Sequence, residues 1–382
     1  MFCNLQNISL IHCSLSCLRI SKVSHKFPKR LSTAFSFPSS HFSSTRLCNP
    51  RAISAAAITT SSSSFTWDDV IAVSRPEYAP HDYSNLKGFF DKIKFCNRGA
   101  ELQPEFIRFV VDGQTVGYIH KSFADHLRGF RNVFTFPQDN SYGNQFGCYV
   151  TLHTMLKTPE EKTRAVGEVI KCLSEKELIP GIRNELYPVS SSFGASVFFS
   201  LERAAAPYFG IKAYGVHMNG YVEKDGQKFL WIGKRSQVKP TYPGMLDHLV
   251  AGGLPHGMAC GENLIKECEE EAGIPRSIAV EAISVGAVSY LDINGPRYKR
   301  DVLFCYDLKL PASFVPKNQD GEVESFRLVP VMHVANVIKR TEFFKPNCSL
   351  VIIDFLFRHG FIDPECFGYL DLLQKLKNGD CS

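Results

Sequence analysis

A glycine-rich turn followed by an acidic helix constrains this chain more than any other segment. The turn spans residues 251–258 and reads Ala-Gly-Gly-Leu-Pro-His-Gly-Met. After it we predict a helix from Cys260 to Ala272 that ends at Gly273, because glycine readily adopts the left-handed conformation that closes many helices. One face of this helix is apolar and can pack on a sheet. Another face is acidic, since three glutamates stand at i, i+3 and i+4, namely Glu267, Glu270 and Glu271.

The acidic face is unfavourable for an isolated helix and therefore calls for a cation. Like charges at i, i+4 destabilise a helix by about 0.2–0.5 kcal/mol, and anions near its C-terminus oppose the helix dipole. Mg²⁺ is usually held by a few carboxylates together with phosphate oxygens of a substrate. The charge pattern alone leaves an alternative open, namely a solvated acidic surface with Lys266 as its only local counter-charge.

Residues 252–274 as a whole resemble the Nudix box, Gly-x5-Glu-x7-Arg-Glu-U-x-Glu-Glu-x-Gly-U, in which U is a bulky apolar residue. The chain departs from this pattern twice, with Met258 in place of the first glutamate and Lys266 in place of the arginine. A lysine keeps the positive charge but loses the two-pronged guanidinium. Glu262 lies one turn before Lys266, within reach of an ion pair. The matching positions are Gly252, Glu267, Glu270, Glu271, Gly273 and Ile274, with Cys268 at the first apolar place.

The resemblance extends beyond the box to residues 231–236 and 241–247 and to the preceding unit. Together these segments are similar to plant plastid Nudix hydrolases and their fungal relatives, in which a domain of unknown function precedes the Nudix domain. The resemblance implies an α+β protein: a Nudix fold, with a mixed sheet between helices in an α/β/α sandwich, preceded by a smaller α+β domain. Such relatives are often labelled as related to thiamine pyrophosphokinase, but this sequence has no P-loop, so we expect no kinase activity.

The family's chemistry implies roles for several residues. Glu267, Glu270, Glu271 and the backbone carbonyl of Ala251 would bind Mg²⁺ or Mn²⁺, with Glu267 as the leading general base. Glu322, in the loop before Phe326, would add another ligand or base. The candidate substrate-binding residues are two basic residues that would steer the diphosphate and two tyrosines that would line a pocket: Lys234, Arg235, Tyr242 and Tyr290.

The predicted reaction is hydrolysis of a pyrophosphate bond in a small diphosphate compound. Thiamine diphosphate or a damaged analogue is the first candidate substrate, and a nucleoside diphosphate derivative such as ADP-ribose or NADH is the broader one. A catalytically degenerate ligand-binding or interaction protein remains the alternative, which the substitutions at Met258 and Lys266 favour and the three retained glutamates oppose. The N-terminal unit would act either as an interaction scaffold or as a lid over the active site.

Composition divides the chain into three segments. Residues 1–64 contain seven Lys or Arg, many serines and no acidic residue, which is typical of an organelle transit peptide followed by a disordered spacer. Dense hydroxyl residues and few arginines favour the chloroplast stroma, with the mitochondrion second and a disordered arm without an address as the alternative. Residues 65–208 form the predicted N-terminal domain and residues 209–382 the predicted Nudix domain.

Local patterns predict the elements of both folded domains. Asp112-Gly113 separates two β-prone runs, which indicates a hairpin, and Thr158-Pro159 begins a helix with a capping box. Runs of β-prone residues predict strands at 216–222, 229–233, 283–291, 302–310 and 326–331, and residues 350–359 predict a helix. His120, His126 and His153 of the N-terminal unit form no catalytic pattern.

The overall composition excludes several classes of protein. The net charge of +5 comes from the first 64 residues, and the near-neutral remainder argues against a nucleic-acid-binding surface. No apolar run approaches the roughly 18 residues of a membrane span. The thirteen cysteines are irregularly spaced, which predicts reduced thiols and no zinc site. The sequence leaves the oligomeric state open.

Overall fold

The computed structural model describes residues 65–79, 85–137 and 149–379. The predicted transit peptide and its spacer, residues 1–64, lie outside the described residues. The described residues all belong to one compact unit, Ser61–Ser382. None of the helices in these ranges is both long and apolar enough to cross a membrane.

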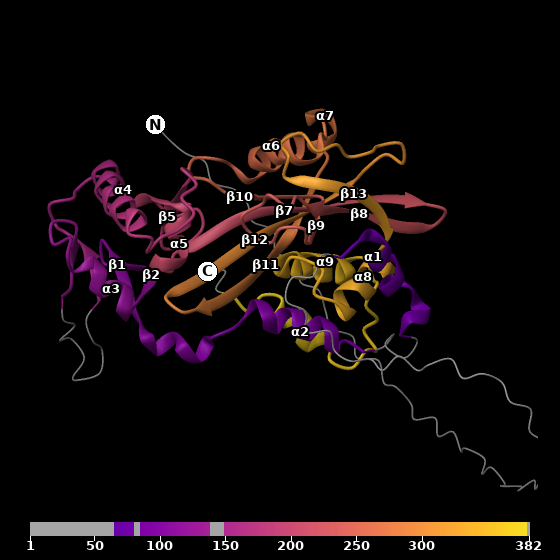
Figure 1. Ribbon diagram of the computed structural model, residues 1–382, viewed down its shortest axis with the longest axis horizontal. Helices are drawn as coiled ribbons and strands as arrows, with labels where there is room; N and C mark the ends of the chain where they lie inside the picture. The colour runs from indigo at the N-terminus through magenta and orange to yellow at the C-terminus, as the bar shows by residue number, and fades with distance from the viewer. Residues whose placement is uncertain (1–64, 80–84, 138–148, 380–382) are drawn as a thin grey trace, which may run out of the picture. The chain divides into compact units, whose positions relative to one another are not determined.

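A mixed sheet forms the centre of the C-terminal half (Figure 1). Its main path runs in the order β11-β12-β7-β8-β13, while β10 pairs with β7 and β9 pairs with β8. Strands β7 and β12 are parallel and the other pairs are antiparallel. The strand bounds are β7 Lys212–Lys224, β8 Gln227–Arg235, β9 Leu246–His248, β10 Val250–Gly253, β11 Ile283–Asn294, β12 Arg297–Lys309 and β13 Val323–Pro330.

Helices cover both faces of this sheet, as the predicted α/β/α sandwich requires. On one face α6 (Cys260–Ala272) buries Leu264 and Cys268 against Val216 and Met218 of β7, with α7 (Arg276–Ala279) beside it. On the other face lie α8 (Val331–Arg340) and α9 (Pro346–Arg358), with the short α10 (Tyr369–Lys375) near the C-terminus (Figure 1). Neighbouring residues of a strand point to opposite faces of the sheet, so each strand contributes side chains to the cores on both faces.

The predicted acidic helix has the bounds expected from its sequence. It begins at Cys260 and ends where Gly273 adopts a left-handed conformation with φ of 61°. The strand predictions of this half and the helix prediction near residues 350–359 are also confirmed.

The first helices of the described chain pack on the sheet's far face. Val70 of α1 (Trp67–Ser74) and Phe89 of α2 (Lys87–Cys96) share one hydrophobic core with α8 and α9. Two short 3₁₀ segments accompany them, η1 (Pro76–Tyr78) and η2 (Ala100–Glu105).

A second core lies in a separate α+β region, as predicted. Its sheet has the order β2-β1-β4-β3, and β5 and β6 form a further two-stranded hairpin. Phe109, Phe199 and Phe209 are fully buried there. The hairpin at Asp112-Gly113 and the capping box at Thr158 are both present. The elements are β1 Phe106–Val111, β2 Gln114–His120, α3 Lys121–Leu127, β3 Phe134–Thr135, β4 Val150–Leu152, α4 Pro159–Glu175, β5 Leu186–Val189, β6 Phe199–Glu202, η3 Arg203–Ala205 and α5 Ala206–Phe209.

Candidate active site

Glu271 is held against the strand that precedes the acidic helix. Its carboxylate accepts a hydrogen bond of 2.8 Å from the backbone N–H of Ala251 in β10. Burial raises the pKa of Glu271 well above its usual range, and the negative charges of Glu267 and Glu322 raise it further. A carboxylate in this position gains from any cation that binds beside it.

Glu267 occupies the space over Gly252. A Cβ atom at Gly252 would collide with the Glu267 carboxyl group, so a larger residue there would require the Glu267 side chain to move. The Glu267 side chain is only 16% exposed. Burial raises its pKa, although the positive charge of Lys266 works in the opposite direction. Glu267 and Glu271, one helical turn apart, therefore both lie against β10.

Lys266 lies close to the carboxylates of both Glu270 and Glu267. Its Nζ lies 2.6 Å from the carboxylate of Glu270 and 3.4 Å from that of Glu267. Glu270 is the most exposed of the three predicted glutamates. The lysine thus reduces the repulsion along the acidic face. The suggested pairing of Glu262 with Lys266 is wrong, because Glu262 binds Arg276 at 2.9 Å instead.

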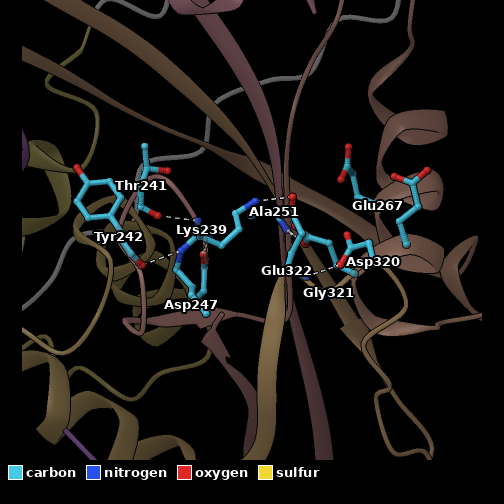
Figure 2. Close-up of polar contacts among 12 residues, drawn as sticks. Lys239, Thr241, Tyr242, Asp247, Ala251, Glu267, Asp320, Gly321 and Glu322 are labelled. Atoms are coloured by element: carbon cyan, nitrogen blue, oxygen red, sulfur yellow. Dashed lines mark hydrogen bonds and ion pairs between the residues drawn. The ribbon is translucent and has the colours of Figure 1, made fainter. Parts of the chain in front are cut away.

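Glu322 approaches the same region from another part of the chain. It directly precedes β13, forms an ion pair with Lys239 and donates its backbone N–H to Asp320 at 2.8 Å. Its charge contributes to the raised pKa of both Glu267 and Glu271. Figure 2 shows Glu322 beside Ala251, with Glu267 on the neighbouring helix. This concentration of carboxylate oxygens suits a hard divalent cation.

The two predicted basic residues are engaged by protein groups. Arg235 donates to the Asp247 carboxylate at 2.9 Å and to the backbone carbonyls of Thr241 and Tyr242 at 3.0 and 3.1 Å. Lys234 pairs with Glu324 at 3.3 Å. Arg235 therefore orders the turn at residues 241–242 and neutralises a buried acid.

The two predicted tyrosines differ in exposure. Tyr242 is 40% exposed and has a positive φ of 52°, a conformation that Arg235 holds through the Tyr242 carbonyl. Such strained non-glycine conformations often occur at functional sites. Tyr290 is buried and donates a hydrogen bond to Asp301. Tyr242 is consequently the more accessible of the two.

Comparison with known proteins agrees with this geometry. A family model described as NUDIX domain matches residues 214–348, and one described as Domain of unknown function (DUF4743) matches residues 88–213. The Arabidopsis thaliana protein named Nudix hydrolase 20, chloroplastic, is 66% identical over 359 residues, which cover 94% of this chain and 95% of the relative. This chain belongs to the Nudix hydrolase family.

Two further relatives are similar to this chain over most of their length. Nudix hydrolase 24, chloroplastic, of Arabidopsis thaliana is 64% identical, with 84% of this chain and 86% of the relative covered. The uncharacterized protein YJR142W of Saccharomyces cerevisiae is 40% identical, with 79% of this chain and 88% of the relative covered. Nudix hydrolases act on diphosphate bonds, and divalent metals are typical of the family.

Sequence reasoning missed residues of the DUF4743 region that touch the Nudix box. Tyr187 of β5 and Arg203 of η3 both lie against Gly253, the residue after the first glycine of the box. No local sequence pattern predicts this contact, because Tyr187 and Arg203 are far from the box in sequence. The adjacent glycines at 252 and 253 were the available signal, since two consecutive residues without side chains allow close approach.

A buried polar cluster formed by residues of β7, β9 and α9 was also missed by the sequence analysis. His217 Nδ1 and His248 Nε2 form a hydrogen bond of 2.7 Å, and the Cys348 thiol donates to Asp247 at 2.6 Å. Among the described residues, His217, His248 and Cys348 form a group whose ligand atoms lie within 4.8 Å of one another. Their wide separation in sequence hides this cluster from a search for metal-ligand spacing.

Proposed function

We propose that this protein hydrolyses the pyrophosphate bond of a small diphosphate compound in a reaction that requires Mg²⁺ or Mn²⁺. The observation that carries the proposal is the placement of Glu267 and Glu271 against β10, with the charge of Glu322 close enough to raise the pKa of both. Lys239 pairs with Glu322 and Lys266 lies 3.4 Å from Glu267, but among the described residues Glu271 forms no ion pair, and an unpaired buried carboxylate is costly. A bound divalent cation removes that cost.

Each side chain has a role in this proposal. Glu267, Glu270 and Glu271 hold the cation together with the Ala251 carbonyl, and Glu322 adds a further oxygen ligand. When bound, the cation lowers the pKa of a water and neutralises charge on the phosphate. Glu267 is the leading candidate to accept the proton of the attacking water, because its half-buried carboxylate lies directly over Gly252 of the box.

The substrate is proposed to be a diphosphate attached to a heteroaromatic group. This class rests on the resemblance to the family, because Figure 2 shows Tyr242, the more exposed of the two predicted tyrosines, at the opposite side of the view from Glu267. Thiamine diphosphate or a damaged analogue is the first specific candidate, and a nucleoside diphosphate derivative is the broader one. The names of both Arabidopsis relatives include the word chloroplastic, which supports a plastid location over a mitochondrial one.

The test is product release from a panel of thiamine diphosphate analogues, ADP-ribose, NADH and nucleotide sugars, with and without Mg²⁺ or Mn²⁺. Glu267→Gln is expected to lower kcat by about 10²–10⁴-fold, the usual contribution of a general base. Glu262→Gln is the matched control, because Glu262 lies on the same helix and pairs with Arg276. Normal turnover in Glu267→Gln and Glu271→Gln, or activity that survives EDTA, would refute the proposal.

A further inference from the structure

The hairpin formed by β5 and β6 of the DUF4743 region is attached to the Nudix box by hydrogen bonds. The backbone N–H of His256 donates to the carbonyl of Leu186 at 2.8 Å. The Ser200 hydroxyl and His256 Nδ1 form a second hydrogen bond of 2.6 Å. His256 belongs to the turn between the first glycine of the box and its helix. The hairpin is therefore fixed to the same turn that positions the acidic helix.

Two side chains of this region reach the strand of the box itself. A Cβ atom at Gly253 would collide with the hydroxyl of Tyr187 and would lie 3.2 Å from Cζ of Arg203. Gly252, one residue earlier, instead faces the carboxyl group of Glu267. Because neighbouring residues of a strand point to opposite faces, β10 has an acidic group on one face and an arginine with a tyrosine on the other.

Arg203 retains the capacity to bind a ligand. One nitrogen of its guanidinium pairs with Glu185 at 2.7 Å, and 43% of its side chain is exposed. A guanidinium has five N–H donors in a flat fork, so a single ion pair does not exhaust it. Its Cζ lies 5.6 Å from the centre of the Tyr187 ring, which fixes the two groups side by side.

The electrostatic surroundings place Arg203 within range of the acidic site. Burial lowers the pKa of Arg203, but Tyr187, Glu185 and Glu267 outweigh it and the net direction is upward. Through Gly252 and Gly253, the Glu267 carboxyl group and the Arg203 guanidinium approach adjacent residues of β10.

We propose that Arg203 binds a phosphate group of the substrate, so that the DUF4743 region supplies part of the diphosphate site. This inference rests on the proposed function. Arginine is suited to the role because its parallel N–H groups match two phosphate oxygens. The N-terminal region then contributes a binding group directly, beyond any role in covering the site.

The first experiment measures kcat and KM for Arg203→Ala, Arg203→Lys and Tyr187→Phe in the full chain. Arg203→Ala is expected to raise KM by about 10–100-fold, the usual range for a charged hydrogen bond to an anion. Arg203→Lys should fall between Ala and wild type, whereas Tyr187→Phe should leave KM near the wild-type value, because the Tyr187 hydroxyl is buried against Gly253. Arg276→Ala is the matched control, since Arg276 also pairs with one glutamate on the surface.

A second variant separates substrate binding from anchoring of the hairpin. If Arg203 only holds Glu185, then Glu185→Gln should reproduce the effect of Arg203→Ala. If Arg203 binds phosphate, Glu185→Gln should leave KM within about twofold of wild type or lower it, because the guanidinium is released from its partner. Equal KM in Arg203→Ala and Arg276→Ala, or loss of affinity in Glu185→Gln equal to that of Arg203→Ala, would overturn the proposal.

Binding of imidodiphosphate, a non-hydrolysable diphosphate, distinguishes this inference from the proposed function. Calorimetry with Mg²⁺ present should show weaker binding by Arg203→Ala than by Arg276→Ala, with unchanged thermal unfolding confirming the fold. If the wild type hydrolyses no diphosphate yet shows this difference, the phosphate site stands and the proposed hydrolysis fails. If imidodiphosphate binds equally to both variants, the phosphate site is refuted even where turnover is observed.

Discussion

Tyr187 and Gly253 are in such close contact that no side chain fits between the Tyr187 hydroxyl and the backbone of the Nudix box. Gly253 has an ordinary extended conformation, so the requirement for glycine there is one of space and not of backbone strain. The preceding residue, Gly252, makes the same kind of contact with Glu267. Two consecutive glycines therefore allow the acidic helix α6 to approach one face of β10 and the DUF4743 region to approach the other.

Gly253→Ala is expected to destabilise the protein, because the new methyl group must displace Tyr187 and Arg203. Inserting a methyl group into a well-packed site costs about 1–3 kcal/mol. Thermal and urea unfolding measure the change. Gly261→Ala is the control, since Gly261 lies in α6 with open space around its Cβ position. That control should stabilise the protein by about 0.5–1 kcal/mol, because alanine is the better helix former. A stable Gly253→Ala variant would show that the contact is not tight.

Met258→Glu is expected to strengthen metal binding, because it restores the first glutamate of the Nudix box. Met258 is half-buried in the turn before α6, and the site already contains Glu267 and Glu271. A further carboxylate near a divalent cation adds attraction, which manganese titration measures as a lower Kd. Met155→Glu serves as the control, since Met155 is exposed and lies in the DUF4743 region. An unchanged Kd would show that position 258 does not reach the cation.

Part of this site could be predicted from the sequence, and there is a physical reason why its other contacts could not. The bounds of α6 and the shared face of Glu267, Glu270 and Glu271 follow from helix periodicity, which is a local property. The ion-pair partner of Glu262 cannot be predicted in this way, because Arg276 and Lys266 are equally plausible partners when only the sequence is known. Tyr187 meets Gly253 only because two cores pack together, and no spacing rule encodes that contact.

Asp247→Asn is expected to destabilise the protein strongly. Burial alone would raise the pKa of Asp247, but the positive charges of Lys345 and Arg235 outweigh it and keep the acid ionised. Breaking a buried ion pair by removing one charge costs about 3–5 kcal/mol. Urea unfolding at pH 7 measures the loss. Asp371→Asn, in the exposed pair with Lys375, should cost less than about 1 kcal/mol. Comparable losses of stability in both variants would contradict the interpretation that Asp247 is held ionised by buried ion pairs.

Stability is expected to fall as the pH drops below about 6.5, because His217 and His248 are buried in the folded protein. Burial lowers the pKa of His248 to about 4, and it lowers that of His217 well below its usual value. Above pH 6.5 both histidines are neutral in the folded and in the unfolded protein, so their contribution to the free energy of unfolding has its full value. Below it the unfolded chain takes up protons that the folded chain resists, so the free energy of unfolding decreases. The decrease should continue down to about pH 4, where His248 also becomes protonated.

The expected slope is about 1.4 kcal/mol per pH unit for each histidine that stays neutral in the folded state. Urea unfolding at a series of pH values between 7.5 and 4.5 measures it. His248→Asn should flatten the profile, whereas His126→Gln, which changes an exposed histidine, should leave it as in wild type. Glu267 and Glu271, whose pKa values are raised in the folded protein, contribute a slope of the opposite sign, so the difference between the wild-type and His248→Asn profiles is what counts. Identical profiles in wild type and His248→Asn would mean that His248 binds protons equally in both states. The 2.7 Å contact between His217 and His248 would then include a charged ring, because one imidazolium can donate to a neutral partner.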